Sequence, residues 1–300
     1  MKRVISFVLL LFIVQSGSAV QPDVLTVDFD DVISIRQKPG IADFATLIAR
    51  VAFWHPSFLS AFLNFNALEL EGRRVASTVD GAANIIHRLL RNLHEQGYPD
   101  LSYYESDIIE RSINPKPLDS VIDFLRALKG MGYTLVGATN QDYLQNKVYR
   151  KKMKDQGVDL DALFDGIVTT RVHHLDRPNG KEVQEDAPYT ELEKGVYMLT
   201  NSKATKPSSL YYQALRRVAR KIHPQARRFI HVDDKQENVG GARDVDFEAI
   251  LFNLPAGTAR KSSPAELNRA LDGYRKGLGK LGIADNPGAE IGLSGAFLAD

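Results

Sequence analysis

Short apolar runs that end in acidic residues alternate along this chain with amphipathic segments, and this alternation is the feature that most restricts its fold. The runs "VLTVDFDD" and "RRFIHVDD" are rich in β-branched and apolar residues, and carboxylates follow each of them at once. Between them, apolar residues recur at helical spacing. This pattern predicts an α/β fold with a Rossmann-like parallel sheet covered by helices on both faces. The chemistry of such a fold lies at the carboxyl ends of its strands.

The elements expected from these patterns follow one another along the chain from residue 117 onward. After the first strand, the apolar periodicity predicts an amphipathic helix from residue 117, a glycine turn at residues 130–132 and a strand that ends at residue 139. Further elements are a helix at 143–156, a strand within 164–170, a helix at 208–222, strands within 227–234 and 247–253, and a helix at 264–278.

The first residues carry the pattern of an exported protein. "MKR" precedes the apolar run 4–14, and "QSGSA" follows it, which predicts a signal peptide at 1–19 that is cleaved after Ala19. The alternatives are a buried first strand or an uncleaved anchor, although the run is short for a membrane-spanning helix. The chain has no cysteine, so disulfides, thiolate metal sites and a catalytic cysteine are excluded. We expect export to the periplasm or the medium, with no stable membrane insertion after cleavage.

The charges of the chain nearly cancel. Lysine and arginine number 38, aspartate and glutamate number 37, and the formal net charge is +1. Such a chain generates no long-range field that would gather nucleic acid. We therefore expect no nucleic-acid partner.

Polar residues gather where the predicted strands end or the next helix begins. Because the carboxyl ends of neighbouring parallel strands share one edge of the sheet, these side chains should converge on one pocket. Carboxylates that face a lysine and a hydroxyl suit a hard cation, and Mg²⁺ is the natural choice because it accepts oxygen ligands and a phosphate. A divalent cation would also turn the repulsion among the carboxylates into coordination. The residues are Asp28, Asp30, Thr139, Asn140, Lys206, Asp233 and Asp234.

The same residue types predict a phosphoryl-transfer reaction. Asp28 can attack phosphorus and form an aspartyl-phosphate. Asp30 lies two residues on, where it can protonate the leaving oxygen and later activate water. Lys206 and Thr139, with Asn140 beside it, are expected to bind the phosphate oxygens.

Four stretches, "VDFDDVI", "LVGATNQ", "KPSSLYYQAL" and "FIHVDDKQENVGGA", resemble the four ordered motifs of the haloacid dehalogenase-like (HAD) superfamily. The resemblance extends over nearly all of the chain after the predicted signal peptide. It implies Asp28 as the nucleophile, Asp30 as the acid/base, and Thr139 and Lys206 as the second and third motifs. It further implies an Mg²⁺ site made of Asp28, Asp30 and the acidic pair Asp233 and Asp234, with Asp234 as the direct ligand and Asp233 in support.

The resemblance also implies a division into domains. Residues 41–111, which carry apolar residues at helical spacing, take the place of a small helical cap that closes over the site. Residues 20–40 and 112–285 then form the core, and 286–300 form a flexible tail. The segment 171–205 is polar and long for a connection, so we expect a functional loop and hypothesise a second lid beside the cap.

The function that follows is hydrolysis of a small phosphorylated metabolite by an Mg²⁺-dependent phosphatase. Dehalogenases of the superfamily lack the acid/base two residues after the nucleophile, so Asp30 favours phosphate over carbon–halogen chemistry. The alternatives are a phosphomutase or other phosphotransferase, and a non-catalytic binding protein with the same fold. Lys203 competes with Lys206 for the lysine role, Asp31 is expected to be structural, and Asn238 either orients the metal site or caps a helix.

Overall fold

The computed structural model describes residues 23–36, 109–110, 113–171, 178–184, 186–252 and 264–280. The predicted signal peptide and tail lie outside these residues, as does the predicted cap apart from residues 109 and 110, so the domain boundaries stay predictions. Among the described helices, none has the length and apolar character needed to cross a bilayer.

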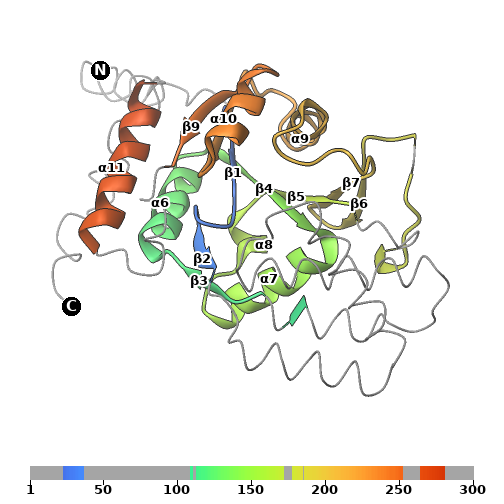
Figure 1. The fold of residues 1–300 in the computed structure, drawn as a ribbon, viewed down its shortest axis with the longest axis horizontal. Helices are drawn as coiled ribbons and strands as arrows, with labels where there is room; N and C mark the ends of the chain where they lie inside the picture. The colour runs from blue at the N-terminus through green and yellow to red at the C-terminus, as the bar shows by residue number, and fades with distance from the viewer. Residues whose placement is uncertain are drawn as a thin grey trace, which may run out of the picture.

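Seven of the described strands form one sheet in the order β6-β7-β5-β4-β1-β8-β9 (Figure 1). All neighbouring strands in it are parallel except β6 and β7. A separate antiparallel pair is formed by β2 and β3. The predicted mostly parallel α/β sheet is therefore confirmed. The strands are β1 (Asp23–Val27), β2 (Ser34–Arg36), β3 (Pro115–Pro117), β4 (Thr134–Asp142), β5 (Gly166–Thr170), β6 (Tyr189–Glu193), β7 (Val196–Leu199), β8 (Arg228–Asp233) and β9 (Glu248–Leu251).

The order of the strands determines where a site can form. From β1 the sheet grows outward through β4, β5 and β7, and the chain then returns to the other side of β1 to add β8 and β9. The direction of the connections therefore reverses between β1 and β8, and a crevice opens outside the carboxyl ends of such strands. Asp28 follows β1 and Asp233 ends β8, and the two strand ends are joined because Asp28 N donates to the carbonyl of Val232 at 2.9 Å.

Helices cover both faces of the sheet (Figure 1). Alternate residues of β1 point to opposite faces, so Leu25 and Val27 belong to one buried cluster and Val24 to the other. Burial on both faces explains why β1 is apolar with little alternation. The first cluster includes residues of α6 (Asp119–Gly130), α7 (Tyr143–Asp155), α8 (Leu160–Leu163) and α11 (Pro264–Lys280), and the second includes residues of α9 (Ser209–Ile222) and α10 (Gln236–Arg243).

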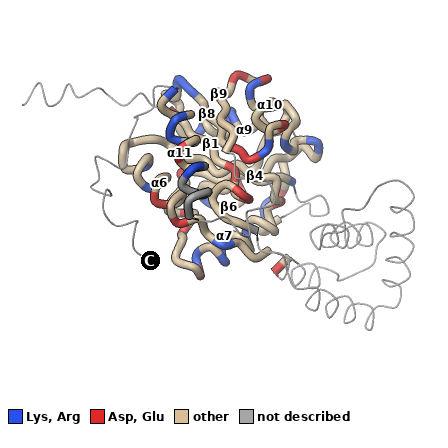
Figure 2. Tube along the Cα trace, turned by 60° about the vertical axis from the view of Figure 1, so that its left-hand side comes forward, with Lys and Arg blue, Asp and Glu red and all other residues tan. Residues whose placement is uncertain are grey.

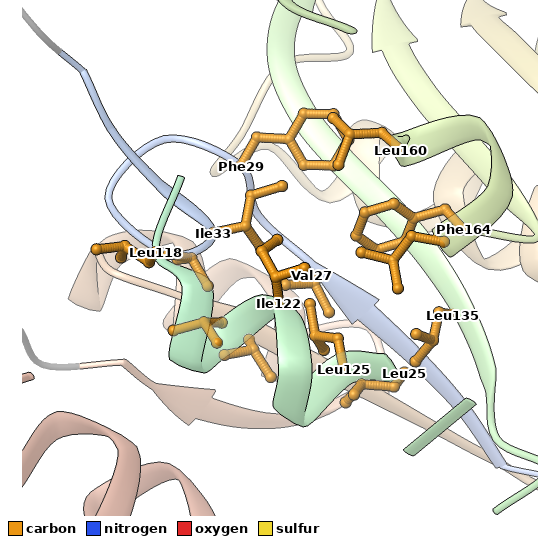
Figure 3. Packing of buried hydrophobic residues seen from close by; sticks show 14 of the residues in the cluster. Leu25, Val27, Phe29, Ile33, Leu118, Ile122, Leu125, Leu135, Leu160 and Phe164 are labelled. Carbon is orange, nitrogen blue, oxygen red and sulfur yellow. The ribbon is translucent and has the colours of Figure 1, made fainter. Parts of the chain in front are cut away.

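An aromatic core holds the turn that follows β1. Figure 3 shows Phe29 pointing into the cluster beside Leu160 and Phe164. Its ring centroid lies 5.4 Å from that of Phe164 and 5.3 Å from that of Tyr149, on which it stacks. A Cβ on Gly137 of β4 would lie 2.5 Å from the Phe29 ring, so glycine is needed there. This packing fixes the backbone between Asp28 and Asp30.

The segment 171–205 differs from the predicted loop. Its described part contains β6 and β7, a hairpin that extends the sheet beyond β5. Thr190 and Leu192 of β6 are buried while their neighbours are half-buried, which is the two-residue alternation of a strand covered on one face. The hairpin turns at Gly195, whose φ is +77°. β4 likewise runs to Asp142 rather than ending at Thr139, with an irregular register between Ala138 and Asp142.

Residues just before the hairpin lie along β6. Asn179 Nδ2 donates to the carbonyl of Leu192 at 3.2 Å, and Lys181 Nζ donates to the carbonyl of Glu191 at 2.9 Å. Gln184 N donates to Thr190 Oγ1 at 3.2 Å. This part of the connection is thus attached to the sheet by several hydrogen bonds.

Acidic and basic residues are interspersed along the described chain (Figure 2). This distribution agrees with the nearly balanced totals in the sequence.

Candidate active site

A buried lysine joins the central strand ends. Lys206 Nζ lies 2.7 Å from Asp28 Oδ1 and 2.7 Å from Asp233 Oδ2, and it donates to the carbonyl of Ala138 at 3.0 Å. These three acceptors match the three protons of an ammonium group. Lys206 is buried whereas Lys203 is exposed, so Lys206 is the lysine that belongs to the site.

The backbone of Lys206 is held by the amide of Asn140. Lys206 N donates to Asn140 Oδ1 at 2.7 Å, and Asn140 Nδ2 donates to the carbonyl of Lys206 at 3.2 Å. This pair of bonds fixes the lysine against the end of β4. The side chain of Asn140 therefore positions Lys206, and its expected contact with phosphate stays a prediction.

Asp233 is fully buried and both of its oxygens accept hydrogen bonds. Oδ2 accepts from Lys206, and Oδ1 accepts from Lys235 N at 3.0 Å and Asn238 Nδ2 at 2.8 Å. Burial alone would raise the pKa of Asp233, but the Lys206 charge and the bond from His231 hold that pKa far below its ordinary value. Asn238 thus orients Asp233, and Lys235, the residue just before α10, makes no side-chain capping bond.

In contrast to Asp233, Asp28 and Asp234 have pKa values that are raised above the ordinary value. Burial, partly opposed by Lys206, raises the pKa of Asp28 to about 7. Burial and the neighbouring Asp28 and Asp233 carboxylates raise the pKa of Asp234 to about 7 as well. Asp234 Oδ1 is buried and has no hydrogen-bond partner within the described residues.

These carboxylates fit a divalent cation. Asp28, Asp233 and Asp234 each place one oxygen within 4.8 Å of the other two. The unpartnered oxygen of Asp234 and the raised pKa of two of the carboxyls are the properties that a bound cation relieves. Asp30, which was also expected to be a ligand, is not part of this carboxylate group.

Asp30 and Thr139 are connected by a residue that sequence reasoning missed. Gln141 Nε2 donates to Asp30 Oδ2 at 3.2 Å, and Gln141 N donates to Thr139 Oγ1 at 3.1 Å. The hydroxyl oxygen of Thr139 is therefore occupied as an acceptor, and its proton can be donated to another group. The one sequence signal for Gln141 is its place directly after "TN" at the end of β4.

His231 is a second residue that was missed. It is fully buried, with Nε2 3.3 Å from Asp233 Oδ2 and Nδ1 2.8 Å from Thr26 Oγ1. Burial lowers the pKa of His231. His231 lies two residues before Asp233 on β8, and residues two apart on a strand face the same side. This spacing is the sequence signal that could have revealed it.

Comparisons with known proteins give structural likenesses alone. No protein-family model and no curated protein matches the chain. A HAD-family enzyme from Bacteroides thetaiotaomicron is 11% identical with a TM-score of 0.42, covering 81% of this chain and 99% of that one. A predicted HAD-like hydrolase from Porphyromonas gingivalis is 13% identical with a TM-score of 0.41, covering 84% and 98%. An L-2-haloacid dehalogenase from Xanthobacter autotrophicus is 15% identical with a TM-score of 0.37, covering 83% and 88%.

Solved structures to which this chain is similar thus include HAD-family hydrolases and dehalogenases, and the Bacteroides enzyme is also known as a magnesium complex. Since all these TM-scores and identities are low, the fold and the chemistry of this chain rest on its own sheet order and site contacts. The resemblance to the HAD superfamily consists of four motifs in order, which the described residues bring to one edge of one sheet.

Proposed function

We propose that the protein is an Mg²⁺-dependent phosphohydrolase that cleaves a small phosphomonoester through an aspartyl-phosphate on Asp28. The observation that carries this proposal is the buried Lys206 ammonium between Asp28 and Asp233, with the unpartnered oxygen of Asp234 beside them. Phosphoryl transfer requires three kinds of group at one site: a nucleophilic carboxylate, a fixed positive charge, and a carboxylate oxygen that is free to bind a metal ion.

The reaction can be assigned to atoms of this chain. Asp28 Oδ1 is held by Lys206, which leaves Oδ2 to attack phosphorus. As the phosphorus–oxygen bond to the substrate alcohol breaks, Asp30 gives its proton to the leaving oxygen. Asp30 then takes a proton from water, which attacks the phosphoryl group and releases inorganic phosphate and free Asp28.

The remaining groups stabilise charge on the phosphoryl oxygens. The hydroxyl proton of Thr139 can be donated because Gln141 N occupies its oxygen. Lys206 supplies a fixed positive charge in a buried setting. When bound, Mg²⁺ would be held by Asp28 and Asp234 with Asp233 in support, and would neutralise carboxylate and phosphate charge. The presence of Asp30 favours this chemistry over carbon–halogen cleavage.

The setting of this activity is proposed from the sequence. The N-terminal pattern supports export to the periplasm or the medium, and the balanced charge supports a small phosphorylated metabolite rather than nucleic acid as the partner.

The test is release of inorganic phosphate from a panel of phosphomonoesters, with Mg²⁺ or with a chelator. We expect metal-dependent release by the wild type and a loss of roughly 10³-fold or more in Asp28→Asn, because the nucleophile is removed. Asp123→Asn is the matched control, since Asp123 is a surface residue of α6 paired with Arg126. Equal activity in wild type and Asp28→Asn would contradict the mechanism. A folded, metal-bound wild type that releases no phosphate from any ester would favour the non-catalytic alternative.

A further inference from the structure

Gln141 contacts two residues that the proposed reaction uses. These are Thr139, on β4, and Asp30, which follows β1. The backbone N–H of Gln141 bonds the Thr139 hydroxyl oxygen, and its side-chain Nε2 bonds Asp30 Oδ2. It lies within the irregular part of β4, between Ala138 and Asp142, where the register with β5 shifts. Irregularities of this kind redirect side chains near active sites.

The amide of Gln141 is oriented by a chain of polar contacts that begins at a buried arginine. Arg150 can only donate, and its Nε bonds Asn146 Oδ1 at 3.1 Å. The NH₂ group of the fully buried Asn146 must then face Gln141, and its Nδ2 lies 3.4 Å from Gln141 Oε1. With its oxygen facing Asn146, Gln141 turns its own NH₂ group toward Asp30.

Arg150 is itself held in place from two sides. Its NH1 lies 2.7 Å from Asp161 Oδ1 and its NH2 lies 2.9 Å from Glu193 Oε1. Glu193 also accepts from Tyr143 OH at 2.6 Å. The orientation of the Gln141 amide is therefore determined by α7, α8 and β6 rather than by the substrate.

We propose that Gln141 is a positioning residue that presents Asp30 Oδ1 to the oxygen of the leaving group; this inference rests on the proposed function. An amide N–H on Oδ2 can donate but cannot accept a proton. The proton that Asp30 transfers is thereby confined to Oδ1, and the carboxyl group is kept from rotating. Gln141 influences the reaction only through Asp30. It therefore affects the protonation of the leaving oxygen and not the attack of Asp28 on phosphorus.

This role has a kinetic signature. An alkyl phosphate has a poor leaving oxygen that needs a proton, whereas para-nitrophenyl phosphate has a good leaving group that needs little help. Loss of the Gln141 donor should therefore lower kcat much more for an alkyl ester than for the aryl ester, with KM nearly unchanged.

The experiment compares both esters in Gln141→Met, which keeps the length of the side chain and removes its donor. We expect kcat to fall by about tenfold more on the alkyl ester than on para-nitrophenyl phosphate, with KM within about twofold. Gln141→Leu, which also removes the donor to Asp30, should show the same selective loss if the methionine variant fails to fold. Gln213→Met is the control, because Gln213 is exposed on α9.

Two results would overturn the role of Gln141 without overturning the proposed function. An equal loss on both esters in an active enzyme would indicate a general structural role. Additive effects of Asp30→Asn and Gln141→Met on the free energy of unfolding would show that the two side chains are not coupled, and this measurement needs no turnover. A wild type that is inactive on both esters would instead overturn the proposed function, and the catalytic role of Gln141 with it.

Discussion

Lys206 is the residue on which the electrostatics of the site depend. Burial opposes its charge, but the carboxylates of Asp28 and Asp233 raise the pKa of Lys206 above its ordinary value, so it stays protonated. The ammonium in turn compensates two carboxylates that are almost completely buried. Removing one partner from such a group leaves uncompensated charge in the interior.

Lys206→Met should therefore lower the free energy of unfolding by about 3–5 kcal/mol in metal-free protein. Lys203→Met should change it by less than about 0.5 kcal/mol, since Lys203 is exposed. Urea denaturation of the two variants beside the wild type measures the difference. Equal stability of the two variants would show that the buried carboxylates do not need the ammonium.

The residues of the site divide by how far the sequence predicts them. Asp28, Lys206 and Asp233 meet as expected, because each follows a strand end or precedes a helix, and parallel strands bring these points to one edge. The position of strand ends does not predict the contacts of Gln141 and His231, although His231 lies two residues before Asp233 and so faces the same side of β8. The contact of Gln141 depends on an irregularity in the register of β4, and the contact of His231 depends on which buried polar atoms lie within hydrogen-bond distance of its ring.

At the level of elements, α10 packs closely on the segment that carries Lys206. A Cβ on Gly241 would lie 2.1 Å from the carbonyl oxygen of Pro207, whereas a Cβ on the neighbouring Gly240 would meet nothing within 4 Å. The missing side chain at Gly241 thus permits the approach of the helix to Pro207. Gly241 is therefore sterically constrained, whereas the preceding residue, Gly240, has room for a side chain.

We predict that Gly241→Ala lowers both stability and phosphate release, because either α10 or the Lys206 segment must move to accommodate the methyl group. The stability loss should be about 1–3 kcal/mol, as for other overpacked sites. Gly240→Ala is the matched control and should be neutral or stabilising by up to about 1 kcal/mol, since alanine favours helix. Thermal unfolding and kcat of both variants test this, and an unimpaired Gly241→Ala would show that the close contact is not a constraint.

Helices were predicted better than the hairpin of β6 and β7. The helix α6 buries residues at helical spacing, including Val121, Ile122 and Leu125, and this period is visible over its whole length. The two strands of the hairpin are each short, and the polar residues of β6 on its less buried face resemble a loop. β7 is established by pairing with β5, a long-range contact that local sequence does not encode, and β6 in turn pairs with β7.

For the whole molecule, the raised pKa of Asp234 links stability to pH and to metal. In the folded protein its carboxyl stays protonated up to about pH 7, whereas in the unfolded chain it ionises near its ordinary value of 3.8. The unfolded state therefore binds fewer protons between these values, and the free energy of unfolding contributed by this group falls as pH rises. Asp28 acts in the same direction, and the buried His231, with its lowered pKa, opposes it below about pH 6.5.

Asp234→Asn removes this contribution together with the interaction between Asp234 and Asp28, whereas His231 is common to both proteins. Without metal, the variant should gain stability relative to the wild type as pH rises from about 4 to about 8. The gain should reach about 1–2 kcal/mol, since solvent screens the partly exposed side chain. Mg²⁺ at about 100 times its Kd should reverse the order by stabilising the wild type by about 2.7 kcal/mol.

Urea denaturation across this pH range, with and without Mg²⁺, makes the measurement. Parallel pH profiles for the two proteins in the absence of metal would contradict the link between Asp234 and stability. Equal stabilisation of both proteins by Mg²⁺ would contradict the assignment of Asp234 as a ligand.

The hydrogen bonds that Asn179 and Lys181 make to β6 have a consequence for the behaviour of the protein in concentrated solution. A strand at the end of a sheet normally offers its carbonyls to any extended chain that approaches, which is how folded proteins begin to aggregate edge to edge. In β6 the carbonyls of Glu191 and Leu192 already accept side-chain donors from the same chain. These bonds leave fewer β6 acceptors for a foreign strand, so we expect them to lower the tendency of this edge to pair with another chain.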